Sequence, residues 1–166
     1  MNLNKNLTHT ISVLVANKPG VLVRIALVFA RRGYNIDSLV VSPTVNPKYS
    51  RMTITAKGDV ETLEMIIKNV DKLIDVLHCS EHTASAVEKE LALLKVKNSP
   101  AIKAFINKNS RKFHVRIDDT TEGYAIIEQT GTTVELDEFE ALIKKYGLLE
   151  MVRTGKVLMA HGKETT

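Results

Sequence analysis

The sequence predicts an α+β fold built from two ferredoxin-like βαββαβ units, and three observations lead to this class. Apolar residues recur at every second position in several short stretches, which is the period of a half-buried strand. Other stretches repeat them at i, i+3, i+4 and i+7, which is the period of an amphipathic helix. The order of these stretches in the first half of the 166-residue chain recurs in the second half, and two domains of about 80 residues each fit that length.

The first unit is expected to begin with a strand and a helix joined by a turn at residues 17–20. The strand carries apolar residues at alternate positions: Ile11, Val13 and Val15. Pro19 is expected to be the first helical residue, because proline is favoured at that position. The helix carries one apolar stripe: Leu22, Ile25, Ala26 and Phe29. Gly33 is expected to end this helix.

A hairpin, a second helix and a fourth strand complete the first unit. Residues 34–41 are rich in strand-forming side chains, the loop "SPTVNPKYS" follows, and residues 51–56 alternate again. After Gly58 and Asp59 a second amphipathic helix carries its own apolar stripe: Leu63, Ile66, Ile67 and Val70. Residues 73–79 resume a strand pattern, which completes the order βαββαβ.

The second half repeats that order, beginning with the strand "LALLKVKN". The next helix carries three apolar residues on one face: Ile102, Phe105 and Ile106. Strands at residues 113–117 and 124–128 flank the turn "DDTTEG". A last helix carries Phe139, Leu142, Ile143 and Tyr146, and residues 148–160 form one final extended segment. The boundary falls near residues 87–93, which predicts domains at 1–87 and 88–166.

Composition and charge exclude several classes of protein. With 44% hydrophobic and 25% charged residues, the chain is typical of a globular protein. Its 23 Lys and Arg against 19 Asp and Glu divide into 11 against 9 through Glu90 and 12 against 10 after it, or +2 in each half. This even distribution argues against nucleic-acid binding. One basic cluster is interpreted as a solvated face: Lys103, Lys108, Arg111, Lys112 and Arg116.

The sequence also predicts a cytoplasmic location. The single Cys79 cannot form an intrachain disulfide, and the polar start "NLNKNLTH" lacks the apolar core of a secretory signal. No apolar run approaches the roughly 20 residues of a membrane-spanning helix, so no membrane association is expected.

The sequence predicts no catalytic site and no metal site. It has no nucleophile elbow, no P-loop and no Gly-rich dinucleotide fingerprint. The strongest metal candidate is "HCSEH", in which His78 and His82 could share one face, but a structural site normally needs four ligands and the other histidines are scattered. Asp118, Asp119 and Glu122 lie where a hairpin turn is expected, and they are interpreted as turn residues.

The turn "NKPG" at residues 17–20 is the strongest binding candidate. A helix that begins here points its unpaired backbone N–H groups and the positive end of its dipole outward, where they attract a carboxylate. Gly20 has no Cβ and permits close approach to the backbone, and the Asn17 amide can both donate and accept hydrogen bonds. A plain helix cap without a ligand is the alternative explanation of the same residues.

Several motifs resemble those of a known family. "NKPGVLVRI", "RRGYNIDSL", "SRMTI" and "KLIDVL" resemble, in order and spacing, the regulatory small subunit of acetolactate synthase, also called acetohydroxyacid synthase. "GTTVELDEF" and "VRTGKVLMAHG" extend the resemblance through the second half. In that family the first half is an ACT domain, a βαββαβ module that binds branched-chain amino acids where two copies pair, and the second half is ferredoxin-like.

The resemblance implies a subunit that catalyses no reaction itself, but binds and activates a separate large subunit and lets valine inhibit it. Thiamine diphosphate, Mg and FAD would belong to the large subunit, and none to this chain. The implied effector pocket lies between two copies of a homodimer and uses Asn17, Gly20, Val21 and Leu22 from one copy, with Asn35 and Ile36 from the other. Lys18-Pro19 and Val23 depart from the family pattern, which leaves the choice between valine and isoleucine open.

In this pocket Leu22 and Ile36 would hold the aliphatic side chain of the effector. Two other classes of function are the alternatives. One is a ferredoxin-like metal- or DNA-responsive regulator, suggested by "HCSEH" and the basic cluster. The other is a small-molecule enzyme on the same fold, which lacks a catalytic constellation.

Overall fold

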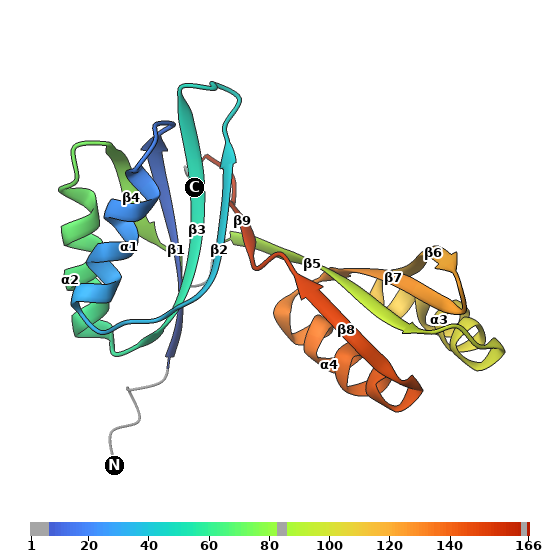
Figure 1. Ribbon diagram of the computed structural model, residues 1–166. Helices are drawn as coiled ribbons and strands as arrows, with labels where there is room; N and C mark the ends of the chain where they lie inside the picture. Colours follow the sequence, from blue (N-terminus) through green and yellow to red (C-terminus); the bar gives the residue numbers. More distant parts are fainter. Residues whose placement is uncertain (1–6, 83–85, 164–165) are drawn as a thin grey trace, which may run out of the picture. The chain divides into compact units, whose positions relative to one another are not determined.

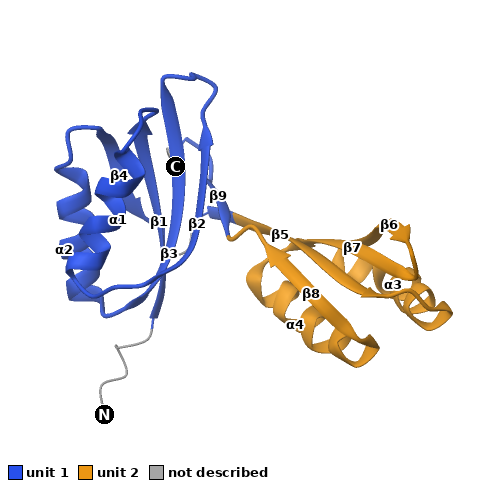
Figure 2. Cartoon of the chain, viewed as in Figure 1, with its two compact units in different colours: residues 1–87, 156–166 blue, residues 88–155 orange. Residues whose placement is uncertain are grey.

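The computed structural model describes residues 7–82, 86–163 and 166, and these residues form two compact units. Unit 1 comprises residues 1–87 together with 156–166, and unit 2 comprises residues 88–155 (Figure 2). Each unit has its own sheet and its own hydrophobic core.

Unit 1 has the predicted order βαββαβ, and its two helices cover one face of a four-stranded antiparallel sheet (Figure 1). Its elements are β1 (Leu7–Ala16), α1 (Val21–Arg31), β2 (Ile36–Pro43), β3 (Tyr49–Gly58), α2 (Val60–Asp71) and β4 (Val76–Glu81). The strand order across the sheet is β2-β3-β1-β4. The prediction of a ferredoxin-like unit is therefore confirmed here.

The core of unit 1 contains the alternating residues of the first strand, since Ile11, Val13 and Val15 are all buried. The stripe of α1 differs from the prediction by one position at its start. Val21, rather than Leu22, is buried with Ile25 and Phe29, while Leu22 is 40% exposed. The reason is that the helix begins at Val21, and residues four apart on a helix share a face.

Unit 2 repeats the same order and is likewise confirmed as ferredoxin-like. Its elements are β5 (Ala86–Lys97), α3 (Pro100–Phe113), β6 (Val115–Thr121), β7 (Tyr124–Gly131), α4 (Thr133–Ile143), the short 3₁₀ helix η1 (Lys144–Tyr146) and β8 (Leu148–Arg153). The strand order is β6-β7-β5-β8. Both helices are capped by hydroxyl side chains: Ser99 accepts from the N–H of Ile102 at 3.2 Å, and Thr132 forms a capping box with Glu135.

The final extended segment differs from the prediction, because it is two strands instead of one. β8 ends at Arg153, Gly155 has a φ of +84°, and β9 (Val157–Ala160) then pairs with β5. A left-handed residue cannot continue a strand, and glycine adopts this conformation without strain. Residues 156–166, which the sequence assigned to the second domain, group with unit 1, although β9 pairs with β5.

A strand boundary in unit 2 also differs from the sequence pattern. The strand predicted to begin at residue 113 begins at Val115 instead, because Phe113 is the last residue of α3 and His114 follows with a φ of +49°.

None of the helices in the described residues is long and apolar enough to cross a membrane.

Candidate functional site

The candidate site is the turn between β1 and α1. Asn17 anchors this turn to the β2–β3 loop, because its N–H donates to the carbonyl of Lys48 at 2.8 Å and its Nδ2 donates to the carbonyl of Pro47 at 3.0 Å. Gly20 has φ +83° and ψ −10°, the values of the third residue of a type II turn that has proline second. The turn is therefore held to the β2–β3 loop by two hydrogen bonds.

Pro19 precedes the helix and is not its first residue, so that prediction is wrong. Gly20 occupies the N-cap position and Val21 is the first helical residue. Proline fixes its own φ near −65°, which suits the second position of this turn as well as a helix start. The positive φ of Gly20 decides between the two and delays the helix by two residues.

The N-terminus of α1 has no side chain to satisfy its backbone. No described side chain caps it, and the first intrahelical bond runs from the N–H of Arg24 to the carbonyl of Gly20 at 3.2 Å. The N–H groups of the first turn consequently point out of the helix end with the positive end of the dipole. An anion placed at Gly20 would meet these donors without steric hindrance from a Cβ.

Charged side chains that the sequence reasoning missed surround this helix end. The Arg24 guanidinium forms an ion pair with Asp75, and Lys18 Nζ lies 3.9 Å from the same carboxyl group. A Cβ on Gly20 would lie 3.5 Å from Arg24 Nη1, which places this guanidinium beside the turn. Arg24 could have been found from its spacing, since it lies four residues after Gly20 on the same helix. Asp75 is distant from the turn in the sequence, so no local spacing indicates that it lies there.

The six predicted site residues divide into two groups at opposite ends of α1 (Figure 1). Gly20 precedes the helix and Asn35 follows it, and 11 helical residues span about 16 Å. The Asn35 amide is exposed and donates to Asp37 at 3.2 Å, while Ile36 is half-buried against the core of unit 1. One copy of the chain therefore does not bring Asn35 to the turn.

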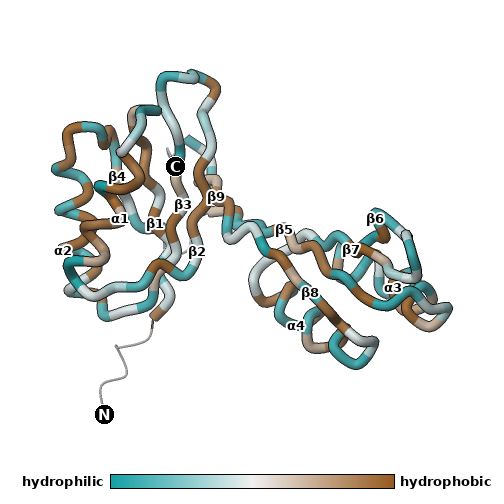
Figure 3. Tube along the Cα trace, viewed as in Figure 1, coloured by the Kyte–Doolittle hydropathy of each residue, from teal (hydrophilic) through white to brown (hydrophobic). Residues whose placement is uncertain are grey.

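Val21 and Leu22 have different surroundings within the first group. Val21 is buried in the core, so only its backbone N–H is available at the turn. Leu22 is 40% exposed, and it belongs to an apolar stripe with Val23, which is 61% exposed, and Leu27, which is 46% exposed. Figure 3 shows that most residues of α1 are hydrophobic.

The alternative sites receive no support from the geometry of the described residues. Within "HCSEH", His78 is exposed, His82 Nε2 lies 3.2 Å from the Ser80 hydroxyl, Cys79 is buried in the core, and Glu81 lies 2.6 Å from the buried His9. Burial raises the pKa of the Cys79 thiol to about 12, so it carries its proton at neutral pH. No three His, Cys, Asp or Glu residues of the described chain are grouped as metal ligands would be.

The basic cluster and the acidic turn are also accounted for by local structure. The five basic residues are exposed, four of them on α3, and Arg116 forms ion pairs with Asp118 and Glu128. Asp119 accepts a hydrogen bond from Thr121 at 3.0 Å. Exposed pairs of this kind contribute little free energy and are common on solvated surfaces.

Comparison with known proteins shows the family to which this chain belongs. Residues 11–78 match the family described as the AHAS small subunit-like ACT domain, and residues 89–162 match the small subunit of acetolactate synthase. The chain therefore belongs to the acetolactate synthase small-subunit family, whose name places it in branched-chain amino acid biosynthesis.

Individual relatives cover nearly the whole chain. A probable acetolactate synthase small subunit from Archaeoglobus fulgidus is 45% identical over 156 residues, which are 94% of this chain and 98% of the relative. The isozyme 3 small subunit of Escherichia coli is 40% identical over 92% of this chain and 94% of its own. The crystal structure of the Thermotoga maritima small subunit is similar with a TM-score of 0.83 and 37% identity, covering 95% of this chain and 99% of that one.

Proposed function

We propose that this chain is a non-catalytic regulatory subunit that binds the catalytic large subunit of acetolactate synthase, raises its activity and makes it sensitive to inhibition by valine or another branched-chain amino acid. The names of the relatives support the pairing with a large subunit. The observation that carries the regulatory part is the uncapped N-terminus of α1 behind Gly20, because it offers backbone donors to the carboxylate of an amino acid.

The effector pocket would be completed by a second copy of the chain. Asn35 and Ile36 are about one helix length from the turn within a copy, so they can complete it only from a partner. The exposed stripe of Leu22, Val23 and Leu27 supports homodimerisation through unit 1, since contiguous apolar surface of this kind is commonly buried between subunits.

The division of labour follows from this arrangement. Every proposed effector contact lies in unit 1, within the predicted domain 1–87, and unit 2 would serve the rest of the assembly. Thiamine diphosphate, Mg and FAD would be bound by the large subunit and would supply the chemistry of the reaction there. The role of this chain is to bind, and to transmit the occupancy of its pocket.

Reconstitution with the cognate large subunit tests the proposal. We expect a complex on a sizing column, higher acetolactate production than from the large subunit alone, and inhibition when valine is added. Valine should also bind the free small subunit, which light scattering should show as a dimer. If no complex forms and activity does not rise, the regulatory role is refuted. Valine binding to a strictly monomeric chain would refute the shared pocket.

A further inference from the structure

Arg24 offers the turn at Gly20 a further donor beyond the backbone N–H groups of α1. A Cβ on Gly20 would lie 3.5 Å from Arg24 Nη1, so this nitrogen adjoins the space that Gly20 leaves open. Nη2 of the same guanidinium donates to the Asp75 carboxylate. Asp75 is the only hydrogen-bond partner of this guanidinium within the described residues, so Nη1 has none there. One nitrogen of Arg24 is therefore bound, and the other is available beside the turn.

Asp75 is anchored by the sheet, so it can hold Arg24 in this position. Its backbone carbonyl accepts from the N–H of Ala16 at 2.8 Å, and β4 begins at the next residue, Val76. Its side chain is 13% exposed, against 46% for that of Arg24. A short side chain on an anchored backbone has few conformations, whereas an arginine side chain has many. The ion pair therefore restricts Arg24 much more than it restricts Asp75.

Two cations face the one carboxylate of Asp75, so the surroundings of the turn remain positive. Lys18 Nζ lies 3.9 Å from this carboxylate, and Arg24 pairs with it directly. The guanidinium has five N–H donors in a planar fork, so it can bind Asp75 and a second carboxylate at the same time. A lysine ammonium is a compact point charge and has no second edge of this kind.

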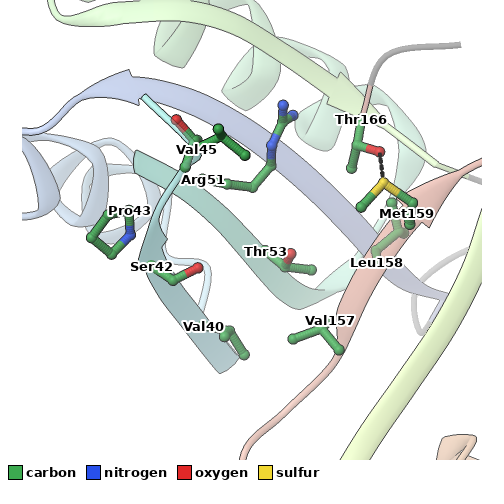
Figure 4. Close-up of a pocket in the computed structure, with 11 residues that line it drawn as sticks. Val40, Ser42, Pro43, Val45, Arg51, Thr53, Val157, Leu158, Met159 and Thr166 are labelled. Carbon is green, nitrogen blue, oxygen red and sulfur yellow. Dashed lines mark hydrogen bonds between the residues drawn. The ribbon is translucent and has the colours of Figure 1, made fainter. Parts of the chain in front are cut away.

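Arg51 is an arginine of unit 1 whose surroundings differ from those of Arg24. It lies on β3 and lines a pocket together with Val157 and Thr166 (Figure 4). Its Nη1 donates to the Ser12 hydroxyl at 3.3 Å. The same nitrogen of Arg24 has no such partner in the described part of the chain. The available nitrogen beside the helix end is thus a feature of Arg24 and not of every arginine in unit 1.

We propose that Arg24 binds the carboxylate of the amino-acid effector through Nη1, and that Asp75 positions the guanidinium over Gly20 for this contact. This inference rests on the proposed function and adds two residues to the effector site. It also fixes the sign of one effect. The negative charge of Asp75 by itself would oppose a bound anion, so its removal would strengthen binding. If Asp75 positions Arg24, its removal weakens binding instead, because the released side chain leaves the turn.

Calorimetric titration of the full-length chain with L-valine and L-valinamide tests this inference. L-Valinamide keeps the ammonium group and the branched side chain but lacks the negative charge of the carboxylate. We expect Arg24→Gln to weaken valine binding by at least about tenfold, since a charge-assisted hydrogen bond is lost, and to change valinamide binding by less than about twofold. Asp75→Asn should weaken valine binding by at least about threefold. Asp75→Glu should weaken it less, because it keeps an anion for Arg24.

Two further variants control for charge and folding. Arg24→Lys keeps the positive charge and can pair with Asp75 but has no second nitrogen, so it should bind valine more weakly than the wild type. Arg116→Gln removes an arginine of unit 2 that also has acidic partners, and it should bind valine like the wild type. Thermal melts show whether each variant is folded at the temperature of the titration. If Arg24→Gln is not folded, Arg24→Lys decides the result.

The possible outcomes separate the parts of the proposal. Unchanged valine binding in a folded Arg24→Gln chain overturns it. Tighter valine binding to Asp75→Asn than to the wild type overturns the positioning role. Equal losses of valine and valinamide binding in Arg24→Gln overturn the carboxylate contact, because the whole pocket would then be disturbed. A wild-type chain that binds no valine refutes the proposed function itself, and this inference with it.

Discussion

The two units build the same strand-to-helix junction and finish it differently. In unit 1 the N–H of Asn17 donates to a carbonyl of the β2–β3 loop at 2.8 Å, and in unit 2 the N–H of Asn98 donates to the carbonyl of Gly123 in the β6–β7 turn at 2.9 Å. Unit 2 then closes its helix end with the Ser99 hydroxyl, while unit 1 ends at Gly20 with no side-chain cap.

This difference separates a structural junction from one that can bind a ligand. A capped helix end has its donors satisfied by its own side chain and gains little from an anion. An uncapped end gains a hydrogen-bonding partner when a carboxylate arrives. The same fold therefore has one capped junction in unit 2 and one uncapped junction in unit 1, at which we propose that an effector binds. Variants at Gly20 and Ser99 test this contrast, and variants at the second helix of each unit extend the comparison of the two units.

The largest effect is expected for Gly20→Asp, which should weaken valine inhibition of the reconstituted enzyme by at least about 100-fold, or ~2.7 kcal/mol. The new carboxylate repels that of valine and competes for the N–H groups of α1. Activation of the large subunit should persist. A titration of activity with valine measures both quantities.

Gly20→Asn is the matched control for this charge. Gly20 has a φ of +83°, where any other residue is strained, and Asp and Asn tolerate this region better than most. Both variants should therefore lose about 1 kcal/mol of stability, and Asn should retain more valine inhibition than Asp. Undiminished inhibition in a folded Gly20→Asp subunit would exclude this turn as the effector site.

The next effect concerns the glycines that end β3 and β7. A Cβ on Gly58 would lie 1.9 Å from the Tyr34 ring, whose hydroxyl donates to the Asp59 carboxylate at 2.7 Å. Gly58→Ala must displace this ring and should cost about 2 kcal/mol. A Cβ on Gly131 would lie 2.8 Å from the Glu135 carboxyl group of the capping box, which is a milder overlap than the 1.9 Å at Gly58, so Gly131→Ala should cost less. Thermal melts that rank the two variants the other way would contradict this comparison.

Ser99→Ala should have a smaller effect, confined to unit 2. Loss of an N-cap hydroxyl costs about 1 kcal/mol, because the N–H of Ile102 then has no side-chain acceptor. Hydrogen exchange of α3 should become faster, while valine inhibition stays unchanged. If Ser99→Ala altered valine affinity as strongly as Gly20→Asp, the two junctions would not differ in function.

The smallest effect is expected in how the melting temperature depends on acid pH. The N–H of Thr62 and the Tyr34 hydroxyl donate to Asp59 and lower the pKa of its carboxyl group to about 2. A lowered pKa in the folded state stabilises the fold above the unfolded value of about 4, and this contribution is lost as the pH falls toward about 2. Asp59→Asn should therefore flatten the decline of the melting temperature over that range.

Glu135→Gln provides the counterpart in unit 2. The backbone N–H of Thr132 lowers the pKa of Glu135 through the capping box, so this substitution should flatten the acid dependence of α4 instead of α2. Hydrogen exchange that follows each helix separately distinguishes the two. An Asp59→Asn variant with the same acid decline as the wild type would contradict the role of this cap.

The sequence by itself determined the fold class, the repeat and the two cores. Alternation at Ile11, Val13 and Val15 and helical spacing at Leu63, Ile66 and Val70 are local patterns, and the burial of these residues follows from them. The "NKPG" turn was also recognisable, because proline and glycine have narrow conformational preferences. The motifs indicated the acetolactate synthase small-subunit family, which the comparisons confirm.

The tertiary structure decided what depends on contacts between distant residues. The positive φ of Gly20 selected a turn over a helix start, and Asp75 joined Arg24 beside it from 51 positions away. β9 follows unit 2 in the sequence but groups with unit 1, where it lies beside Arg51 of β3. The alternating pattern of residues 51–56 showed Arg51 only as one polar position of a strand. Local periodicity specifies which face of an element is buried, but the partners of a polar side chain are set by the packing of elements that are remote in the chain.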